Sequence, residues 1–549
     1  MFVHRLKSSI ALSGLVVLLF LSGCTGWGGG PVTFDEQFKL LQGDLKALFG
    51  IENKLEKPLT LYEAMARGIK YNLDHRLIAM EEVIAGGEIN LQAAEIFPSV
   101  TAEARHVGRR SDSASSSQSV ITGTQSLEPS ISTERHRKTA SLEASWNVID
   151  AGLAVIRTKQ VSDEAQISME RRRKVIHNII QDVRFAYWQA ASSQMLSGRI
   201  DQLLEEGKLA ANRIQQTEDE GLAPPAETLQ SQSRLLEAMH ELMVLRSQLS
   251  FAKTELASLV NLPPSAEYTL AINEESWGKD AKIPELTVPA EELERIALII
   301  RPEMREEVVM ARFATNHVRE TILETFPGLE MLVGRNYDSN KFLVDNRWTN
   351  FSLGLTQNLI KIFTLPMRFN QAENRVKLAA LKRQALGAAV MAQVHVSVIR
   401  FKLAEERYQI MQKLHGVNTR MVHLAKSQDI AETLSGAELL EVEMDELLTT
   451  IRMHVAHAEL QNSYGRLINT LGIDPLPETT ENVSTSELAA IIEQRFATLD
   501  ENTLKNYIGI IQETGKGCST DSVNETLGLN PALVAHSTYK PKFILTLKE

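Results

Sequence analysis

The chain has 549 residues, of which 43% are hydrophobic, and a formal net charge of −11 at pH 7. This length exceeds what one ordinary core needs, so we expect several domains or an elongated shape. The acidic balance argues against a nucleic-acid partner, because neutralising phosphates requires a surplus of Lys and Arg. Two cysteines, Cys24 and Cys518, are too few for a disulfide scaffold or a four-ligand zinc site, and no role is predicted for Cys518.

The first 23 residues have the pattern of a secretory signal. Basic residues at positions 5 and 7 precede an apolar run at 10–21, which is shorter than the ~20 residues of a membrane-spanning helix. The sequence LSGC at 21–24 resembles the bacterial lipobox, which implies that Cys24 is the lipid-modified (palmitate-bearing) first residue of the mature protein. The alternative is a plain secretory signal with Cys24 near the cleavage point. No other stretch reaches 18 apolar residues, so we expect any further membrane crossing to use strands.

Two halves of the chain repeat one pattern. The first opens with LTLYEA at 59–64 and the second with VPAEEL at 288–293. Each opening helix is broken, at 72–74 and at 301–303, and the helix that follows ends at a Phe-Pro pair, Pro98 or Pro327. Proline cannot continue the preceding helical turn, so each Phe-Pro marks a physical boundary.

After each Phe-Pro the apolar period changes from helical to two. The alternation predicts strands at about 97–107 and 139–149, and again at about 327–337 and 348–359. Segments of about ten residues with one apolar face are what a membrane barrel requires. An ordinary half-buried hairpin shows the same alternation, so the pattern alone leaves both open.

Long helical hairpins follow each strand pair. We expect helices at about 152–217 and 225–262 in the first half, and at about 367–427 and 436–471 in the second. Apolar residues at heptad spacing, such as Leu235, Leu242, Leu249 and Leu256, predict antiparallel coiled coils. The predicted fold class is therefore mainly α with membrane β. The expected domains are a signal peptide (1–23), a lipid-anchored segment (24–57), a first repeat (58–265), a linker (266–287), a second repeat (288–475) and a C-terminal extension of unknown role (476–549).

Four strands form an open sheet with two edges. Within lipid an unpaired edge costs several kcal/mol for each unsatisfied backbone group, so neighbouring copies must donate strands. Three copies would supply twelve strands around a water-filled interior, and their long helices would form an α-helical barrel. We therefore expect a homotrimer.

The motifs LTLYEA, Phe-Pro and SWNVIDAGL at 145–153 resemble those of the TolC family, over roughly residues 58–475. The resemblance implies an outer-membrane channel subunit, the passive exit duct of a tripartite efflux or type I secretion system. It also implies two partners, a periplasmic adaptor protein and an inner-membrane transporter. The alternative is a periplasmic coiled-coil adaptor or scaffold lipoprotein without a pore.

The resemblance also implies functional positions at the helical tips. Gly221 and Leu222, followed by Glu227, match the tip that adaptor hairpins grip, although a Gly/Pro turn between helices has the same composition. Glu438 and Glu441 match two acidic residues at the family's entrance, where threefold symmetry would make a cation-favouring ring. A solvated helix face is the alternative. Asp429 and Leu434 occupy positions where the family's best-known tip carries a Tyr and an Arg, so we expect a different closing contact.

Other conspicuous residues have ordinary interpretations. Four consecutive cations at 171–174 spread around a helix, and we expect a solvated outer face there. Trp146 and Trp348 fit either interfacial anchors or ordinary packing. No nucleophile–base, His-Glu-x-x-His, paired-cysteine or dinucleotide pattern occurs, so we predict no catalytic residue, cofactor or metal site and no enzyme activity.

Overall fold

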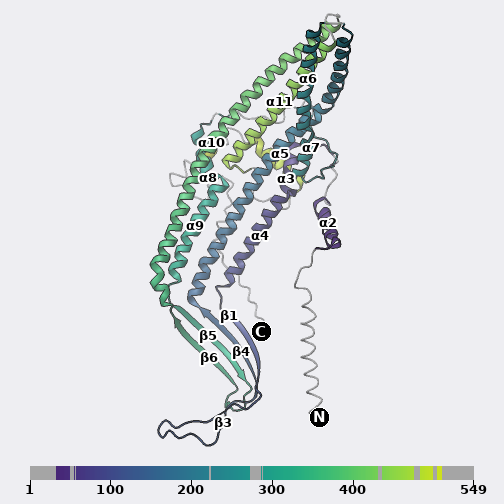
Figure 1. Ribbon diagram of the computed structural model, residues 1–549. Coiled ribbons are helices and arrows are strands. Elements are labelled where there is room, and N and C mark those ends of the chain that lie inside the picture. Colours follow the sequence, from purple (N-terminus) through teal and green to yellow (C-terminus); the bar gives the residue numbers. More distant parts are fainter. Residues whose placement is uncertain are drawn as a thin grey trace.

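The computed structural model describes residues 32–49, 55, 57–221, 224–272, 286, 288–430, 436–474, 476, 483–498 and 504–509. The expected signal peptide, Cys24, Leu222, Leu434 and Cys518 lie outside these residues. The molecule is elongated, with a four-stranded sheet at one end and the tips of two helical hairpins at the other (Figure 1).

The first half contains helices before and after a strand pair. Two further strands of two residues each, β2 (Ala114–Ser115) and β3 (Ser130–Ile131), lie in the loop between β1 and β4. The main elements are α2 (Phe34–Phe49), α3 (Leu61–Tyr71), α4 (Leu73–Ala94), β1 (Ser99–Gly108), β4 (His136–Asn147), α5 (Val148–Asp219), α6 (Pro225–Ser250) and α7 (Ala252–Leu259).

The second half repeats this order, and a short helix follows it. Its elements are α8 (Ala290–Ile300), α9 (Pro302–Leu323), β5 (Gly328–Asp338), β6 (Arg347–Thr356), α10 (Leu359–Ile430), α11 (Gly436–Leu471) and α12 (Thr485–Thr498). The fold is thus mainly helical, with long helices and β-hairpins. The helices α5 and α10 have 72 residues each, which corresponds to about 108 Å.

The two halves correspond residue by residue. An offset of 229 residues carries both bounds of α3 onto those of α8, and both bounds of α4 onto those of α9. An offset of 211 carries both bounds of α5 onto those of α10, and the start of α6 onto that of α11. Even the left-handed residues that end the return helices correspond, with Asn261 at φ 56° and Gly472 at φ 74°.

Side-chain caps explain the helix boundaries. Thr60 Oγ1 accepts the Glu63 N–H at 3.2 Å and begins α3, and Asn72 Oδ1 accepts the Asp74 N–H at 2.9 Å and begins α4. In the second half Arg301 replaces Asn72, and Pro302 occupies the first turn of α9, where its missing N–H costs nothing. One residue therefore separates α3 from α4, and likewise α8 from α9, in each half.

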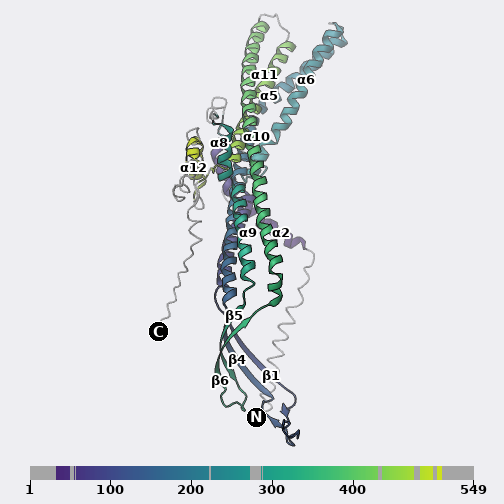
Figure 2. The same cartoon turned by 90° about the vertical axis from the view of Figure 1, so that its left-hand side faces the viewer.

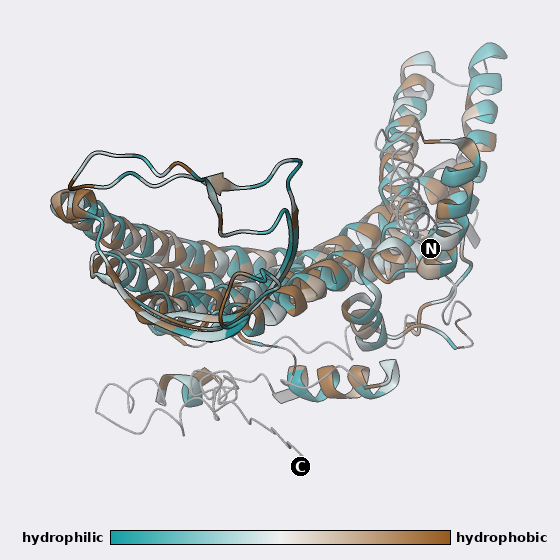
Figure 3. Ribbon diagram, turned by 90° about the horizontal axis from the view of Figure 1, so that it is seen from below, coloured by the Kyte–Doolittle hydropathy of each residue, from teal (hydrophilic) through white to brown (hydrophobic). Residues whose placement is uncertain are grey.

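All four main strands form one antiparallel sheet in the order β1-β4-β5-β6. The helices that flank it keep the same lateral order, so α4, α5, α9 and α10 lie side by side (Figure 1). Further from the sheet, α5 with α6 and α10 with α11 form two hairpins whose ends diverge (Figure 2). Seen from the sheet end, hydrophilic and hydrophobic residues alternate around the helices (Figure 3).

Several helix boundaries differ from the expected ones. The helix α5 begins at Val148 rather than near 152, and α10 begins at Leu359 rather than near 367. Pro366 suggested a start after it, but it lies inside α10. Contacts of Lys361 and Arg368 with Glu324 hold these first turns against α9, which offsets the lost hydrogen bond. The expected helix at 225–262 is divided at Phe251 and ends at Leu259.

Buried apolar residues form three clusters along the helices. One joins α3, α5, α7 and α12 around Trp188, a second joins α8, α10 and α11 around Phe401, and a third joins α5, α6 and α11 towards the tips. Phe496 of α12 packs against Tyr62 of α3, with ring centroids 6.4 Å apart. The described part of the C-terminal extension thus completes the core in the middle of the molecule.

One described helix, α10, carries an 18-residue window apolar enough to span a membrane by composition, with a mean hydropathy of 1.3 and 28% of the window buried. The sequence had suggested no such stretch. Exposed apolar residues on α10, such as Leu378, Leu381 and Leu403, lie on a helix whose other side packs against α9 and α11. We therefore interpret the apolar surface of α10 as an uncovered packing face.

Gly472 offers a test of the packing where α11 ends. Its φ is 74°, and an added Cβ would lie 2.5 Å from the Arg301 Cα. We expect Gly472→Ala to lower the free energy of unfolding by about 2–4 kcal/mol, since backbone strain and a clash with main chain add. Thermal unfolding followed by circular dichroism measures the effect. Gly221→Ala is the matched control, because Gly221 has φ 67° but open space around it. Equal loss of stability in both variants would contradict the packing argument.

Candidate channel wall and entrance

One face of the sheet is apolar across all four strands. The register places Val100 beside Ala144, Ala144 beside Val333, and Val333 beside Phe351, so these residues form one row. Successive rows on this face lie two residues apart along each strand. The large exposed apolar residues of the face are Val100, Leu142, Trp146, Val333, Tyr337, Phe351, Leu353 and Leu355. No described element covers them, and the exposed Arg335, in the row of Leu142, interrupts this apolar surface near its loop end.

Aromatic side chains lie near both ends of this apolar face. Trp146 is at the helix end, and Tyr337 is at the loop end, where the Arg347 guanidinium lies 5.9 Å from its ring centroid. From the row of Leu329 to that of Tyr337 the strand advances about 27 Å, close to the height of a membrane barrel's apolar band. Trp348 lies on the opposite face, in the row of Asn336. Of the two tryptophans, Trp146 therefore has the position of an interfacial anchor.

The other face of the sheet is polar. Ser99 and Ser145 pair through their hydroxyls at 2.6 Å, and Asn336 Nδ2 donates to Asn350 Oδ1 at 2.6 Å. Gly334 lies between Glu143 and Asn350, and a Cβ there would meet Asn350 Oδ1 at 2.5 Å. The sheet thus separates a polar from an apolar environment. Its outer strands β1 and β6 each pair on one side only among the described strands.

The passage from strand to long helix is built the same way in both halves. Asn147 Oδ1 accepts the Ile149 N–H and Asn358 Oδ1 accepts the Ile360 N–H, each at 3.0 Å, so both long helices have an Asn N-cap. The residue before each Asn also bonds back to the turn before the first strand. Trp146 Nε1 donates to the Ile96 carbonyl and Gln357 Nε2 to the Thr325 carbonyl, each at 3.0 Å. We call these two hydrogen bonds the junction bonds.

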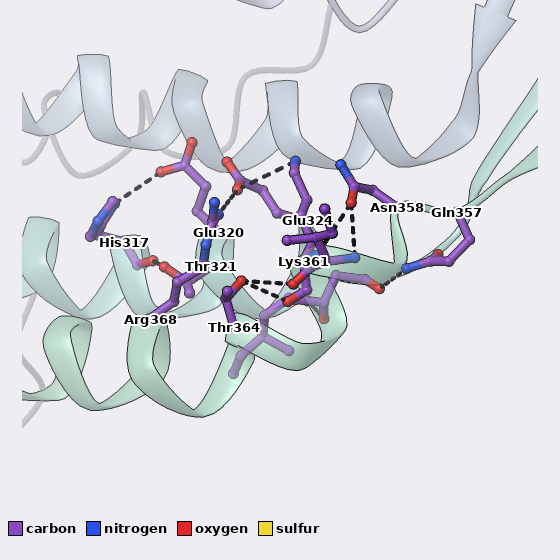
Figure 4. Close-up of polar contacts among 12 residues, drawn as sticks. His317, Glu320, Thr321, Glu324, Gln357, Asn358, Lys361, Thr364 and Arg368 are labelled. Atoms are coloured by element: carbon purple, nitrogen blue, oxygen red, sulfur yellow. Dashed lines mark hydrogen bonds and ion pairs between the residues drawn. The ribbon is translucent and has the colours of Figure 1, made fainter.

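Ion pairs surround the second junction. Glu324, the residue that follows α9, contacts Arg368 at 3.2 Å and Lys361 at 3.8 Å, both on α10, and Glu320 of α9 bonds His317 at 3.1 Å (Figure 4). Arg157 of α5 reaches Glu320 at 2.9 Å. The base of three neighbouring helices is thereby tied together beside the sheet.

The contact between α5 and α9, which we call the internal seam, joins the two halves through buried charges. Arg305 donates to Glu170 at 2.6 Å and Arg312 to Asp163 at 2.7 Å. Burial raises the pKa of Asp163 in spite of its hydrogen bonds to Arg312 and Asn316. Removing one member of such a pair leaves a buried charge uncompensated, so the pairs specify which helix surfaces meet.

The expected solvated face at 171–174 holds only for Arg171 and Lys174, whose side chains are 51% and 49% exposed, whereas that of Arg173 is 14% exposed. Each of the four cations contacts a carboxylate from another part of the fold, because α5 has helices on several sides. Burial opposes ionisation of Asp474, but its contacts with His177 and Arg173 hold the pKa of that carboxyl below its usual value. The pairs are Arg171–Glu306 at 2.8 Å, Arg172–Glu82 at 2.7 Å, Arg173–Asp474 at 2.7 Å and Lys174–Glu303 at 3.3 Å.

The predicted tip residues lie at the end of α5 and the start of α6. Gly221 is exposed and left-handed at φ 67°, and α6 begins at Pro225. Glu227 belongs to the first turn of α6, but its side chain, like Leu222 as a whole, lies outside what the structure describes. The side chain of Asp429 is outside it as well. The proposed adaptor contacts therefore remain predictions.

The predicted entrance residues lie in the first two turns of α11. Glu438 is exposed, and Glu441, one turn further along, pairs with Arg234 of α6 at 3.5 Å. Spacing of three residues places both carboxylates on one side of the helix. The Arg234 contact could not be predicted, since Arg234 and Glu441 come from different halves of the chain.

Two histidines of α11 are buried between α5 and α10. Burial, with smaller contributions from His457 and His415, lowers the pKa of His454 to about 3. Burial and then the Arg184 charge lower the pKa of His457 to about 4. The His457 ring stands edge-on to Trp188 at 4.7 Å, which excludes water from it. No three His, Cys, Asp or Glu side chains within the described ranges are placed to hold a metal ion.

Comparison with known proteins identifies this architecture. The model of the outer membrane efflux protein family matches residues 79–262. The match covers the segment from α4 to the end of the first half, so this part of the chain is similar to the family. No curated protein matches the sequence.

Several solved outer membrane proteins share the fold at low sequence identity. The Campylobacter jejuni CmeC outer membrane channel has 13% identity and a TM-score of 0.58, covering 87% of this chain and 95% of that chain. The open-state Neisseria gonorrhoeae MtrE channel has 15% identity and a TM-score of 0.57, covering 75% and 88%. Vibrio cholerae VceC has 14% identity and a TM-score of 0.54, covering 75% and 96%.

The family match and the shared fold agree with the predictions made from the sequence. Both support an outer-membrane efflux channel subunit with a periplasmic helical region, a non-enzymatic transport protein. Sequence reasoning missed the two junction bonds and the internal seam. The matching Asn147 and Asn358 could have indicated the junctions, whereas the seam depends on packing between segments about 150 residues apart.

The buried histidines of this efflux protein predict an acid-sensitive helical region. Their pKa values are lowered on folding, so between pH 6.5 and about 4 the unfolded chain binds protons that the folded chain does not. The free energy of unfolding therefore falls with decreasing pH, by up to about 1.4 kcal/mol per pH unit for each histidine. Thermal unfolding at pH 7.5 and pH 5 measures the fall. We expect His454→Asn with His457→Asn to reduce it, and His240→Asn, on the exposed side of α6, to leave it unchanged. An equal fall in all variants would refute the assignment.

Proposed function

We propose that three copies of this chain close into a passive exit duct, with a twelve-stranded β-barrel in the outer membrane and an α-helical barrel in the periplasm. The observation that supports it most is the sheet of four strands with one apolar face and two unpaired edges. A membrane-embedded sheet needs every edge paired, because hydrocarbon offers backbone groups no other partner. Neighbouring copies of the same sheet supply that pairing with the apolar face kept outside.

The helices support the same assembly. At about 108 Å, α5 and α10 are long enough to reach far across the periplasm from the sheet. No residue of α4 is buried in the single chain, and its exposed apolar residues include Leu77, Met80 and Val83. A second copy would cover them.

The duct would work with partners at its periplasmic tip. We propose that a periplasmic adaptor grips the turn at Gly221, Leu222 and Glu227, and that an inner-membrane transporter supplies the energy. The family match supports this, since TolC-family channels function in tripartite efflux assemblies. Lipid on Cys24 would add an anchor in the outer membrane. A periplasmic adaptor without a pore, the alternative, gives the apolar sheet face no role.

Substitutions on the two faces of β6 test the barrel. Phe351 is on the apolar face and Ser352, its neighbour, on the polar face. We expect Phe351→Lys to destabilise membrane insertion by about 2–4 kcal/mol, which would deplete folded trimer in outer-membrane extracts, and Ser352→Lys to be tolerated. Native mass measurement and conductance in planar bilayers provide the readouts. The proposal would be refuted if the wild-type protein were monomeric and non-conducting, or if both variants gave the same amount of folded trimer.

Charge at the entrance has a separate test. We propose that Glu438 and Glu441 line the constricted entrance and favour cations. Glu438→Gln with Glu441→Gln should lower the cation preference measured as the reversal potential in a salt gradient. Arg234→Gln is the matched control, because it breaks the pair with Glu441 but removes a positive charge, so the preference should move the opposite way. Unchanged reversal potentials in both variants would refute the role.

A further inference from the structure

The two strand hairpins have the same register. Ser99 faces Ser145 in the first hairpin and Gly328 faces Thr356 in the second. The offset of 229 residues carries Ser99 to Gly328, and the offset of 211 carries Ser145 to Thr356. These offsets also relate the flanking helices, so sheet and helices follow one duplication. Between the hairpins, β4 pairs with β5, with Ala144 facing Val333.

The outer strands β1 and β6, whose free edges find no partner among the described strands, correspond by the duplication to β5 and β4, which pair with each other. By the same offsets β6 corresponds to β4, and β1 corresponds to β5. We propose that the contact between two copies repeats the internal seam, so that Leu355 faces Ala104 of a second copy, Gly354 faces Arg105 of that copy, and α10 packs against its α4. This inference rests on the proposed ring of copies and specifies how the copies join.

The side-chain faces agree with this register. Leu355 belongs to the apolar face of β6, and Ala104 belongs to the apolar face of β1. A slip by one residue would place apolar side chains of one copy on the polar face of the next. Such a register is unfavourable because one face of the sheet meets lipid and the other meets water. The duplication thus selects a register that keeps both faces continuous around the ring.

Side-chain size agrees as well. In the internal seam Gly334 faces Glu143, and a Cβ on Gly334 would lie 3.1 Å from the Glu143 Cγ. In the proposed contact the small residue is on the other strand, where Gly354 faces Arg105. Within the described chain nothing lies within 4 Å of a Cβ built on Gly354, so space remains for the larger side chain.

The helices show what distinguishes the contact between copies from the internal seam. Glu170 is buried against Arg305 in the internal seam, and its duplicate on α10, Leu381, is 62% exposed. On α4 the duplicate of the buried Val309 is Met80, 60% exposed, and that of Arg312 is Val83, 68% exposed. Where two copies would meet, an apolar residue thus replaces the buried Glu170, whereas Arg76, the duplicate of Arg305, keeps the cation. The exposure of the apolar residues in one chain is explained by a missing neighbour.

Disulfide trapping tests the register at single-residue resolution. In a Cys518→Ser background, Leu355→Cys is combined in turn with Ala102→Cys, Ala104→Cys and His106→Cys, and membranes are oxidised. Directly opposed residues have Cα atoms about 4.5–5.5 Å apart, within disulfide range, whereas a two-residue shift gives about 7–8 Å. We expect dimer and trimer bands in denaturing gels to be strongest with Ala104→Cys. Ala144→Cys with Val333→Cys is the intrachain control, because this pair is the duplicate of the proposed one.

The outcomes separate this inference from the proposed function. Trimer with cross-links strongest at Ala102→Cys or His106→Cys would overturn the register and keep the ring. No cross-link between chains in any variant, with the intrachain control oxidised and the protein monomeric, would overturn the ring itself. The Cys518→Ser background alone should give no bands, which excludes a contribution from Cys24.

A second pair tests the helices independently. Leu381 and Arg76 are the duplicates of Glu170 and Arg305, whose long side chains meet at their ends at 2.6 Å, so cysteines at these positions are joined with a bifunctional thiol reagent rather than by direct oxidation. We expect Leu381→Cys with Arg76→Cys to cross-link between copies, and Leu381→Cys with Glu88→Cys, more than three turns further along α4, to remain unlinked. Equal trapping of both pairs would show that α10 does not meet α4 of a second copy in the internal-seam geometry.

Discussion

Unpaired backbone at the outer edges of the sheet is the constraint on which this structure depends. Four strands with one apolar face expose N–H and C=O groups on β1 and β6, and hydrocarbon leaves those groups nothing but another strand to bond. The same single chain leaves apolar side chains of α4 and α10 uncovered at the corresponding lateral edges. Sheet and helices therefore share one requirement, and an arrangement that satisfies the sheet edges brings those helices together as well.

Duplication explains how one chain can present two edges that fit each other. Because the halves correspond over whole helices, each edge has a partner-bound duplicate inside the chain. During folding, the internal seam between α5 and α9 must still be distinguished from the contact between α10 and α4 of two copies. Glu170 on α5 pairs with Arg305 on α9, and if α9 instead met α10 of another copy in the same geometry, Arg305 would face the apolar Leu381 and Glu170 would lose this partner. The charged pair inside the chain thus disfavours that mispairing of helices.

Much of the fold could be predicted from the sequence because its signals are local. Phe326-Pro327 ends a helix by steric necessity, and alternation such as that around Phe351 has the period of a strand. Local signals failed where packing decided. Pro366 argued for a later start of α10, yet contacts with Glu324 retain the earlier turns. The cations at 171–174 suggested solvent, yet carboxylates from distant segments surround them. For the candidate entrance, the positions of Glu438 and Glu441 on a helix could be predicted, but the pair between Arg234 and Glu441 could not.

The distribution of contacts also determines where the molecule can move. At the sheet end, the junction bonds of Trp146 and Gln357 fix each long helix to the turn before its hairpin, and the ion pairs of Glu320 and Glu324 bind three helices together. At the tips, Glu441 meets Arg234 at 3.5 Å, and the Arg234 side chain is half exposed to water. Exposed pairs contribute only about 0–1 kcal/mol, whereas breaking a buried one costs several times more. Near the tips the hairpins are therefore held mainly by the apolar cluster of α5, α6 and α11 and only weakly by ion pairs, whereas polar contacts determine the geometry of the sheet and its junctions.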